Sequence, residues 1–200
     1  NPRGNCGYPT SMRYLVVSDT HGNLQDLRDA IGRYGPFDGL VHLGDGVLDG
    51  FSIARECGIP FHGVRGNTDF GVDFPDMDVA DLDGRPYLLL HGFQLEMNPY
   101  HPPAVWRKTL AELAKMAKRK KARGVFFGHT HQALLDLAGG MLVLNPGDQY
   151  RGASVPPSFA VLGTRNGETR VSLYRRGAPD RWHLFAEAYV KEKAPEPFYP

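Results

Sequence analysis

The chain has 200 residues, 42% of them hydrophobic, and a formal net charge of +1 at pH 7. This length and composition suit one soluble globular domain, and the balanced charge argues neither for nor against nucleic acid as a partner. No apolar run approaches the roughly 20 residues of a membrane helix, and two cysteines cannot form a disulfide framework, so we expect a cytoplasmic protein without membrane association.

The first part of the chain predicts alternating strands and helices. Residues 1–11 lack the apolar stretch of a signal peptide, and we expect either a disordered arm or a remnant of cloning. Strands are predicted over residues 13–19, 38–46 and 59–69, each ending in polar residues, with helices between them at residues 22–34 and 47–58. This order favours parallel pairing of the three strands.

The second part predicts hairpins around one long helix. Two strand-like runs meet at Asp83-Gly84, and later hairpins turn at Gly139-Gly140 and Asn166-Gly167. The long helix covers residues 102–124, and a further strand follows it up to Gln132. The apolar stripe of the helix is predicted to include Val105, Leu110, Leu113 and Ala117.

Side chains that can bind metal ions follow five of the predicted strands. They are Asp19, His21, Asp45, Asn67, His91, His129 and His131. Ligands of open α/β sheets bind beyond the carboxyl ends of the strands, so these residues can converge on one rim. In extended chain, Asp19 and His21 would face the same side, as would His129 and His131.

The composition of this set predicts the kind of metal site. Seven side chains exceed the needs of one tetrahedral zinc ion and suit two divalent ions with one bridging carboxylate. The absence of thiolates argues against an iron–sulfur cluster, and four histidines argue against Mg²⁺ or Ca²⁺. We expect Mn²⁺, with Fe²⁺, Co²⁺, Ni²⁺ and Zn²⁺ as alternatives.

Simpler explanations exist for single residues of the set. Asp19 could cap the helix that follows it, Asp45 could be a turn residue, and His91 could be a hydrogen-bonded histidine at a strand end. The pair His129 and His131 is hard to explain without a metal. The basic run at residues 115–123 could indicate nucleic-acid binding, but the C-terminus of a helix favours such charges in any case.

The motifs together resemble those of the calcineurin-like metallophosphoesterase superfamily, in its small bacterial and archaeal phosphodiesterase branch. They occur in order as "SDTHG", "LGDG", "RGNTD", "LLHG" and "FGHTH". The resemblance implies an α/β fold, a four-layer α/β/β/α sandwich with two mixed sheets. The metallophosphoesterase domain would span residues 12–176, preceded by the arm at 1–11 and followed by a C-terminal extension at 177–200 that ends in a loose tail.

The resemblance also implies roles for the seven residues. Asp19, His21 and His131 would hold a first metal ion, Asp45 would bridge, and Asn67, His91 and His129 would hold a second ion. Asp45, Asn67 and His129 would be catalytic residues, and a metal-bridging hydroxide would attack phosphorus in line. The substrate would be a small phosphoester or a nucleotide. A phosphomonoesterase, a nucleotide pyrophosphatase and a non-catalytic scaffold remain alternatives, and a homo-oligomer is left open.

Two positions depart from the family pattern. Many members have histidine after the asparagine of "GNTD", where it can help the leaving group depart, and this chain has Thr68. A threonine hydroxyl cannot act as a general acid near pH 7. The branch often has serine after "NPG", and this chain has Asp148, to which the sequence assigns no role.

Overall fold

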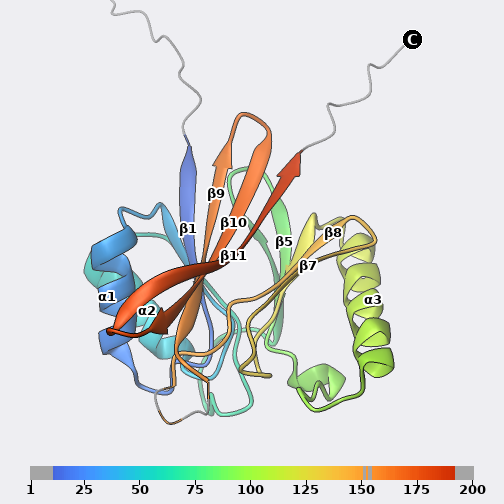
Figure 1. The fold of residues 1–200 in the computed structure, drawn as a ribbon, viewed down its shortest axis with the longest axis horizontal. Helices are drawn as coiled ribbons and strands as arrows, with labels where there is room; N and C mark the ends of the chain where they lie inside the picture. Colours follow the sequence, from blue (N-terminus) through green and yellow to red (C-terminus); the bar gives the residue numbers. More distant parts are fainter. Residues whose placement is uncertain (1–10, 151, 153–154, 192–200) are drawn as a thin grey trace, which may run out of the picture.

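The computed structural model describes residues 11–150, 152 and 155–191. Figure 1 shows two β-sheets packed face to face, with α1 and α2 on one outer side and α3 on the other. The expected N-terminal arm, apart from Ser11, and residues 192–200 of the expected C-terminal extension lie outside the described residues.

The first sheet has six strands in the order β11-β10-β9-β1-β2-β3. β1, β2 and β3 pair in parallel, as predicted, whereas β9, β10 and β11 join the sheet antiparallel. The strands are β1 (Met12–Val17), β2 (Gly39–His42), β3 (Phe61–Gly63), β9 (Ser158–Arg165), β10 (Glu168–Gly177) and β11 (Arg181–Lys191). The helices α1 (Leu24–Tyr34) and α2 (Val47–Cys57) connect the three parallel strands.

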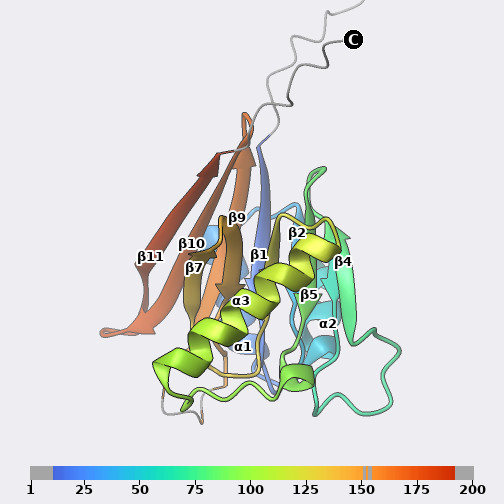
Figure 2. The same ribbon diagram turned by 90° about the vertical axis from the view of Figure 1, so that its right-hand side faces the viewer.

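The second sheet has five strands in the order β4-β5-β6-β8-β7. Its central strands β5, β6 and β8 run parallel to one another. The strands are β4 (Met77–Asp81), β5 (Pro86–Leu90), β6 (Gly124–Phe126), β7 (Leu134–Ala138) and β8 (Met141–Asn145). The short helix η1 (Phe93–Leu95) and α3 (Pro103–Arg119) connect β5 to β6, and α3 crosses the outer face of the sheet (Figure 2).

Three apolar clusters hold the four layers together. The central cluster lies between the sheets and includes Val16, Leu89 and Phe126. The other two clusters join the first sheet to α1 and α2 and the second sheet to α3. Burial of apolar surface is the main force that stabilises such layers. The predicted sandwich with two mixed sheets is therefore confirmed.

The predicted elements form, but several are shorter than predicted: β3 ends at Gly63, β6 at Phe126 and α3 at Arg119. All three hairpins form at the predicted turns. Val105 is 41% exposed because the buried stripe of α3 runs through Trp106, Leu110, Leu113 and Ala117, about 100° away around the helix. β11 was not predicted, because its side chains are exposed or half-buried along most of its length and give no clear alternation of apolar and polar residues.

In the part of the chain that the structure describes, no helix has the length and apolar character to cross a membrane.

Candidate metal centre

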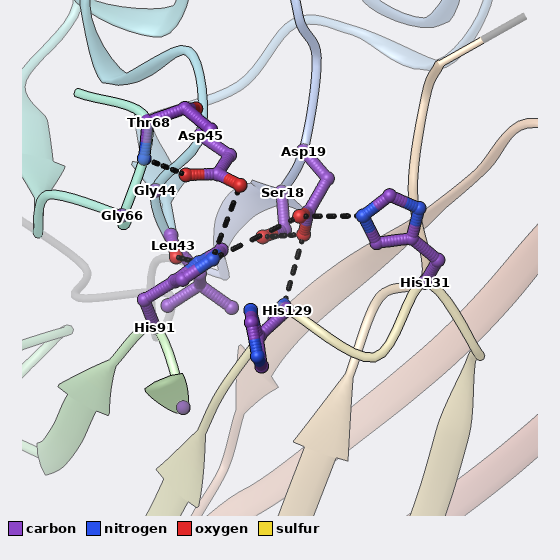
Figure 3. A network of polar contacts seen from close by, with 12 residues as sticks. Ser18, Asp19, Leu43, Gly44, Asp45, Gly66, Thr68, His91, His129 and His131 are labelled. Carbon is purple, nitrogen blue, oxygen red and sulfur yellow. Dashed lines mark hydrogen bonds and ion pairs between the residues drawn. The ribbon is translucent and has the colours of Figure 1, made fainter. Parts of the chain in front are cut away.

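The predicted ligands lie together at the carboxyl ends of parallel strands from both sheets. Asp19 and His21 follow β1, Asp45 follows β2, and Asn67 lies in the loop after β3. From the second sheet, His91 directly follows β5, and His129 and His131 follow β6. The site therefore forms where the two sheets meet, and Figure 3 shows side chains from both sheets pointing toward one another.

Five of these seven residues have left-handed backbone conformations. The φ angles are 52° at Asp19, 43° at His21, 55° at Asp45, 66° at His129 and 58° at His131. Positive φ is uncommon for residues other than glycine and clusters at functional sites. The expectation that each pair faces one side because the chain is extended is wrong, since β1 ends at Val17 and β6 ends at Phe126. Left-handed turns beyond the strand ends set the directions of these side chains instead.

The first group of candidate ligand atoms belongs to Asp19, His21 and His131, which lie within 4.8 Å of one another. Asp19 is fully buried, and its Oδ1 lies 3.2 Å from His131 Nε2. Its Oδ2 accepts hydrogen bonds from Ser18 Oγ at 2.5 Å and from the His129 backbone N–H at 3.1 Å. One oxygen of Asp19 is thus fixed by the protein, and the other faces the site.

The second group belongs to Asp19, Asp45 and His91. Asp45 Oδ2 lies 3.4 Å from His91 Nε2 and 3.8 Å from His21 Nε2, between residues of the two predicted ions. Asp45 Oδ1 accepts a hydrogen bond from the Thr68 backbone N–H at 2.8 Å. His91 Nδ1 donates to the Leu43 carbonyl at 2.7 Å, so the proton on this nitrogen leaves Nε2 to face the two carboxylates.

The remaining two predicted ligands lie at the edge of these groups. The half-buried His129 ring packs edge-on against the His91 ring, with 5.0 Å between centroids. Asn67 is exposed and sits one residue before Thr68, whose backbone binds Asp45. The structure therefore brings five predicted ligands into two compact groups and places His129 and Asn67 beside them.

The donor set fits divalent metal ions. Asp19 Oδ1 and His91 Nε2 are buried without a hydrogen-bond partner among the described residues, although buried polar atoms are normally paired. Their separation is 3.9 Å, and the other gaps between facing ligand atoms are 3.2, 3.4 and 3.8 Å. Most of these gaps are too long for hydrogen bonds, but they suit neighbouring ligands around an ion with bonds of about 2.1 Å.

The carboxylates shift the pKa values of the histidines that face them. The adjacent carboxylates of Asp148 and Asp19 raise the pKa of His131 to about 10. Burial alone would lower the pKa of His91, but the neighbouring carboxylates of Asp45 and Asp19 raise it. Burial and the charge of His91 lower the pKa of His129. Burial opposes ionisation of Asp45, yet the nearby His91 and the hydrogen bond from the Thr68 N–H lower its pKa well below the usual range.

Asp69 holds the loop that carries Asp45. Its two carboxylate oxygens accept four backbone N–H groups at 2.8–3.2 Å, from Asp45, Gly46, Val47 and Gly66. Asp69 therefore supports the site through hydrogen bonds to the backbone. Arg65, two residues before Asn67, pairs with Asp76.

Two glycines allow the loops to approach one another closely. A Cβ atom on Gly66 would lie 2.1 Å from Asp45 Oδ1, and one on Gly128 would lie 1.9 Å from Ser18 Oγ. Contacts this short are not found for real Cβ atoms. The glycines of the "RGNTD" and "FGHTH" motifs are thus required by close packing around the two carboxylates.

Asn145 and Asp148 of "NPGD" are site residues that the sequence did not identify. Asn145 Nδ2 donates to Gly128 O and to Thr130 Oγ1, both at 3.0 Å, and so joins this turn to the loop of His129 and His131. Asp148 is fully buried, and its Oδ2 lies 2.9 Å from His131 Nδ1. The only signal in the sequence was an acid directly after a glycine turn at the end of a buried strand.

A cavity of about 300 Å³ opens beside the metal centre. Its lining includes His129, Thr130, His131 and Gln132 on one side and Pro99 and Tyr100 on the other. Tyr100 is 87% exposed at its edge. A small substrate that reached the two histidines would contact this wall.

Comparison with known proteins gives a consistent set of relatives. A family model described as the calcineurin-like phosphoesterase superfamily domain matches residues 12–167. A probable metallophosphoesterase of Bacillus subtilis, YsnB, is 30% identical over 165 residues, which cover 82% of this chain and 90% of the relative.

Solved structures show the same fold. A predicted phosphoesterase of Streptococcus pneumoniae superposes with a TM-score of 0.65 at 25% identity, covering 89% of this chain and 99% of the other. Vps29 of Entamoeba histolytica, solved in complex with Zn²⁺, gives a TM-score of 0.70 at 20% identity, with coverage of 90% and 100%.

Proposed function

The chain belongs to the calcineurin-like phosphoesterase superfamily, and from this premise we propose that it is a dinuclear metal-dependent phosphodiesterase. The observation that carries the proposal is the pair of donor groups that share Asp19. Within them, Asp19 Oδ1 and His91 Nε2 are buried and lack partners among the described residues. Two buried atoms that both offer a lone pair, aimed at one space, are costly unless a cation fills it.

The residues divide between two ions. Asp19, His21 and His131 would hold the first ion, and His91, with His129 and Asn67, the second. Asp45 Oδ2, which lies between His21 and His91, would bridge. When bound, the ions lower the pKa of water from 15.7 to about 7 and neutralise charge on the phosphoryl oxygens. Mn²⁺ is the ion we propose, since imidazole with carboxylate and amide ligands suits it.

The protein's own contribution is to fix donor atoms and protons. Leu43 O keeps a proton on His91 Nδ1, so His91 Nε2 is available as a ligand. Thr68 N–H and Asp69 hold the carboxylate and the backbone of Asp45 in place. Such preorganisation lets charge develop on a bound phosphoryl group without reorganisation of the site.

A diester is the substrate class we favour because of Thr68. This residue stands beside Asp45, where a histidine could protonate the leaving group, and threonine cannot do so near neutral pH. A phosphodiester with a stable leaving group, such as a phenolate, needs the least help of this kind. The cavity beside His129 and His131 would receive a small phosphoester or nucleotide.

The test is hydrolysis of bis-p-nitrophenyl phosphate by the purified protein loaded with Mn²⁺. We expect activity that is lost in His131→Ala and kept in His183→Ala, a matched change at an exposed histidine. Equal activity in the two variants would rule out the proposed centre. Faster hydrolysis of p-nitrophenyl phosphate or of a nucleoside triphosphate would instead favour a monoesterase or a nucleotide pyrophosphatase.

A non-catalytic scaffold of the same fold is the second candidate, because one structural neighbour is Vps29, named for vacuolar protein sorting. Both candidates predict metal binding, so stoichiometry alone does not separate them. A protein that binds two equivalents of Mn²⁺ but hydrolyses none of these phosphoesters would favour the scaffold.

A further inference from the structure

We propose that Asp148 is a positioning residue that orients His131 for binding of the first metal ion. This inference rests on the proposed metal centre but not on any particular substrate. The Asp148 carboxylate is fully buried, and its Oδ2 lies 2.9 Å from His131 Nδ1. On the other side of the same ring, His131 Nε2 lies 3.2 Å from Asp19 Oδ1. The imidazole is thus held between a supporting carboxylate and a candidate metal ligand.

The turn that carries Asp148 is anchored on both sides. The Ser158 backbone N–H donates to the Asp148 carbonyl at 2.8 Å, and the Gln149 N–H donates to the Asp19 carbonyl at 3.2 Å. These bonds fix the backbone from which the carboxylate projects into the site. Its position is also fixed relative to Asp19, the residue that the two ligand groups share.

Burial makes His131 the necessary partner of this carboxylate. A buried charge is costly unless it is paired, and within residues 11–150, 152 and 155–191 His131 is the only side chain that forms an ion pair with Asp148. His131 itself is 35% exposed in its side chain and lies in a loop with positive φ. Neither burial nor a helix or strand fixes the orientation of the His131 ring. The Asp148 carboxylate therefore fixes it.

The contact also decides which nitrogen binds metal. A neutral imidazole has one N–H, and the Asp148 carboxylate, 2.9 Å from Nδ1, favours that proton on Nδ1, which leaves the Nε2 lone pair toward Asp19. Partners of this kind orient the ring and raise the basicity of the ligand, and their loss costs 10–100-fold in metal affinity in other proteins. His91 is held at Nδ1 by the neutral Leu43 carbonyl, so the two ions would differ in affinity.

The test is titration of the metal-free protein with Zn²⁺ against a competing chelator. We expect Asp148→Asn to weaken binding at one of two sites by about 10–100-fold and to change the other much less. The matched control is Asp136→Asn, which removes an exposed carboxylate on β7. This variant should bind zinc as the wild type does. Nitrogen-15 NMR of the zinc-loaded wild type should show His131 protonated at Nδ1.

A double-mutant cycle separates positioning from a general structural effect. If Asp148 acts through His131, adding Asp148→Asn to His131→Ala should change zinc affinity by less than about twofold. An equal loss in both backgrounds would overturn the proposal, as would wild-type affinity at both sites in Asp148→Asn. Should Asp148→Asn misfold by circular dichroism, Asp148→Ser carries the same test with a smaller side chain. Failure of the wild-type protein to bind zinc would instead reject the proposed metal centre itself.

Discussion

At the scale of single residues, the sequence identified the chemistry of the site but not its geometry. The residue types and their order were enough to select Asp19, Asp45 and His91, which the structure places within reach of one another. Their directions depend on left-handed backbone at the loop entrances, which no periodicity reveals. The sequence assigned no role to Asp148 because its role depends on contact with His131, which is distant along the chain.

Replacement of Thr68 by histidine should restore a general acid. The Thr68 backbone N–H binds Asp45 at 2.8 Å, so a side chain at this position is fixed beside the proposed bridging residue. We expect Thr68→His to raise kcat by about tenfold or more for a diester with an alkyl leaving group, such as a 2′,3′-cyclic nucleotide. The rate on bis-p-nitrophenyl phosphate should change little, because p-nitrophenolate departs without a proton.

Thr68→Ser is the control for this change, since serine is no better an acid than threonine. A rise of the same size on both substrates would argue against proton donation and in favour of a general effect on binding.

His42 is a buried histidine that should make stability depend on pH. Its Nδ1 accepts the Gly44 N–H at 3.1 Å, and its Nε2 lies 3.0 Å from Thr20 Oγ1, which in turn donates to Asp49. Burial lowers the pKa of His42 to about 4, whereas that of an unfolded chain is near 6.5. Below pH 6.5 His42 becomes protonated in the unfolded state, whereas in the folded state it stays neutral until the pH falls to about 4.

The free energy of unfolding should therefore be highest above pH 6.5 and fall by roughly 3 kcal/mol between pH 6.5 and 4 on account of His42. Urea unfolding of the metal-free protein at several pH values measures this fall. His42→Gln should be less stable at pH 7 but show a flatter dependence over the same range. His183→Gln, an exposed control, should keep the wild-type slope, and identical slopes in all three proteins would contradict the prediction.

At the scale of elements, the sequence predicted the helices, strands and turns that depend on neighbouring residues. The three hairpins followed from their turn residues, and the parallel strands from alternation with helices. β11 has no such signal, because its pairing with β10 rather than its own pattern makes it a strand. Edge strands of this kind depend on a neighbour that the local sequence does not describe.

Asp69 links the loop after β3 to the loop of Asp45 and the start of α2. Loss of its carboxylate should loosen the loop of Asp45. Because its carboxylate accepts four backbone N–H groups, we expect Asp69→Ala to lower the free energy of unfolding by about 3 kcal/mol or more. Mn²⁺ affinity should fall as well, since Asp45 and the start of α2 lose their common acceptor. Urea unfolding and metal titration measure the two effects. Asp73→Ala, at an exposed aspartate of the following loop, should alter neither.

At the scale of the whole molecule, the metal centre joins the two sheets. Asp19 and Asp45 come from the first sheet, and His91 and His131 come from the second. Ions bound between them should therefore stabilise the sandwich as a unit. Binding to the folded state alone contributes about 2.7 kcal/mol per site at a free concentration of 100 Kd, so Mn²⁺ should raise Tm by several degrees.

The stabilisation by Mn²⁺ should disappear with a chelator and be smaller in His131→Ala, as measured by differential scanning calorimetry. A Tm that does not respond to Mn²⁺ in the wild type would contradict binding across the sheets.

Metal binding should also release protons, with a dependence on pH that the histidines determine. In the metal-free protein, carboxylates raise the pKa of His131 to about 10, so its imidazole holds an extra proton at pH 7. His131 must lose this proton to become a ligand. Affinity for Mn²⁺ should therefore increase with pH, by up to about tenfold per pH unit for each proton released. Calorimetric titration at pH 7 in buffers of different ionisation enthalpy should count at least one proton, and His131→Ala should release about one fewer. A count of zero would mean that His131 is neutral before the metal binds, and that the carboxylates around it act only as ligands.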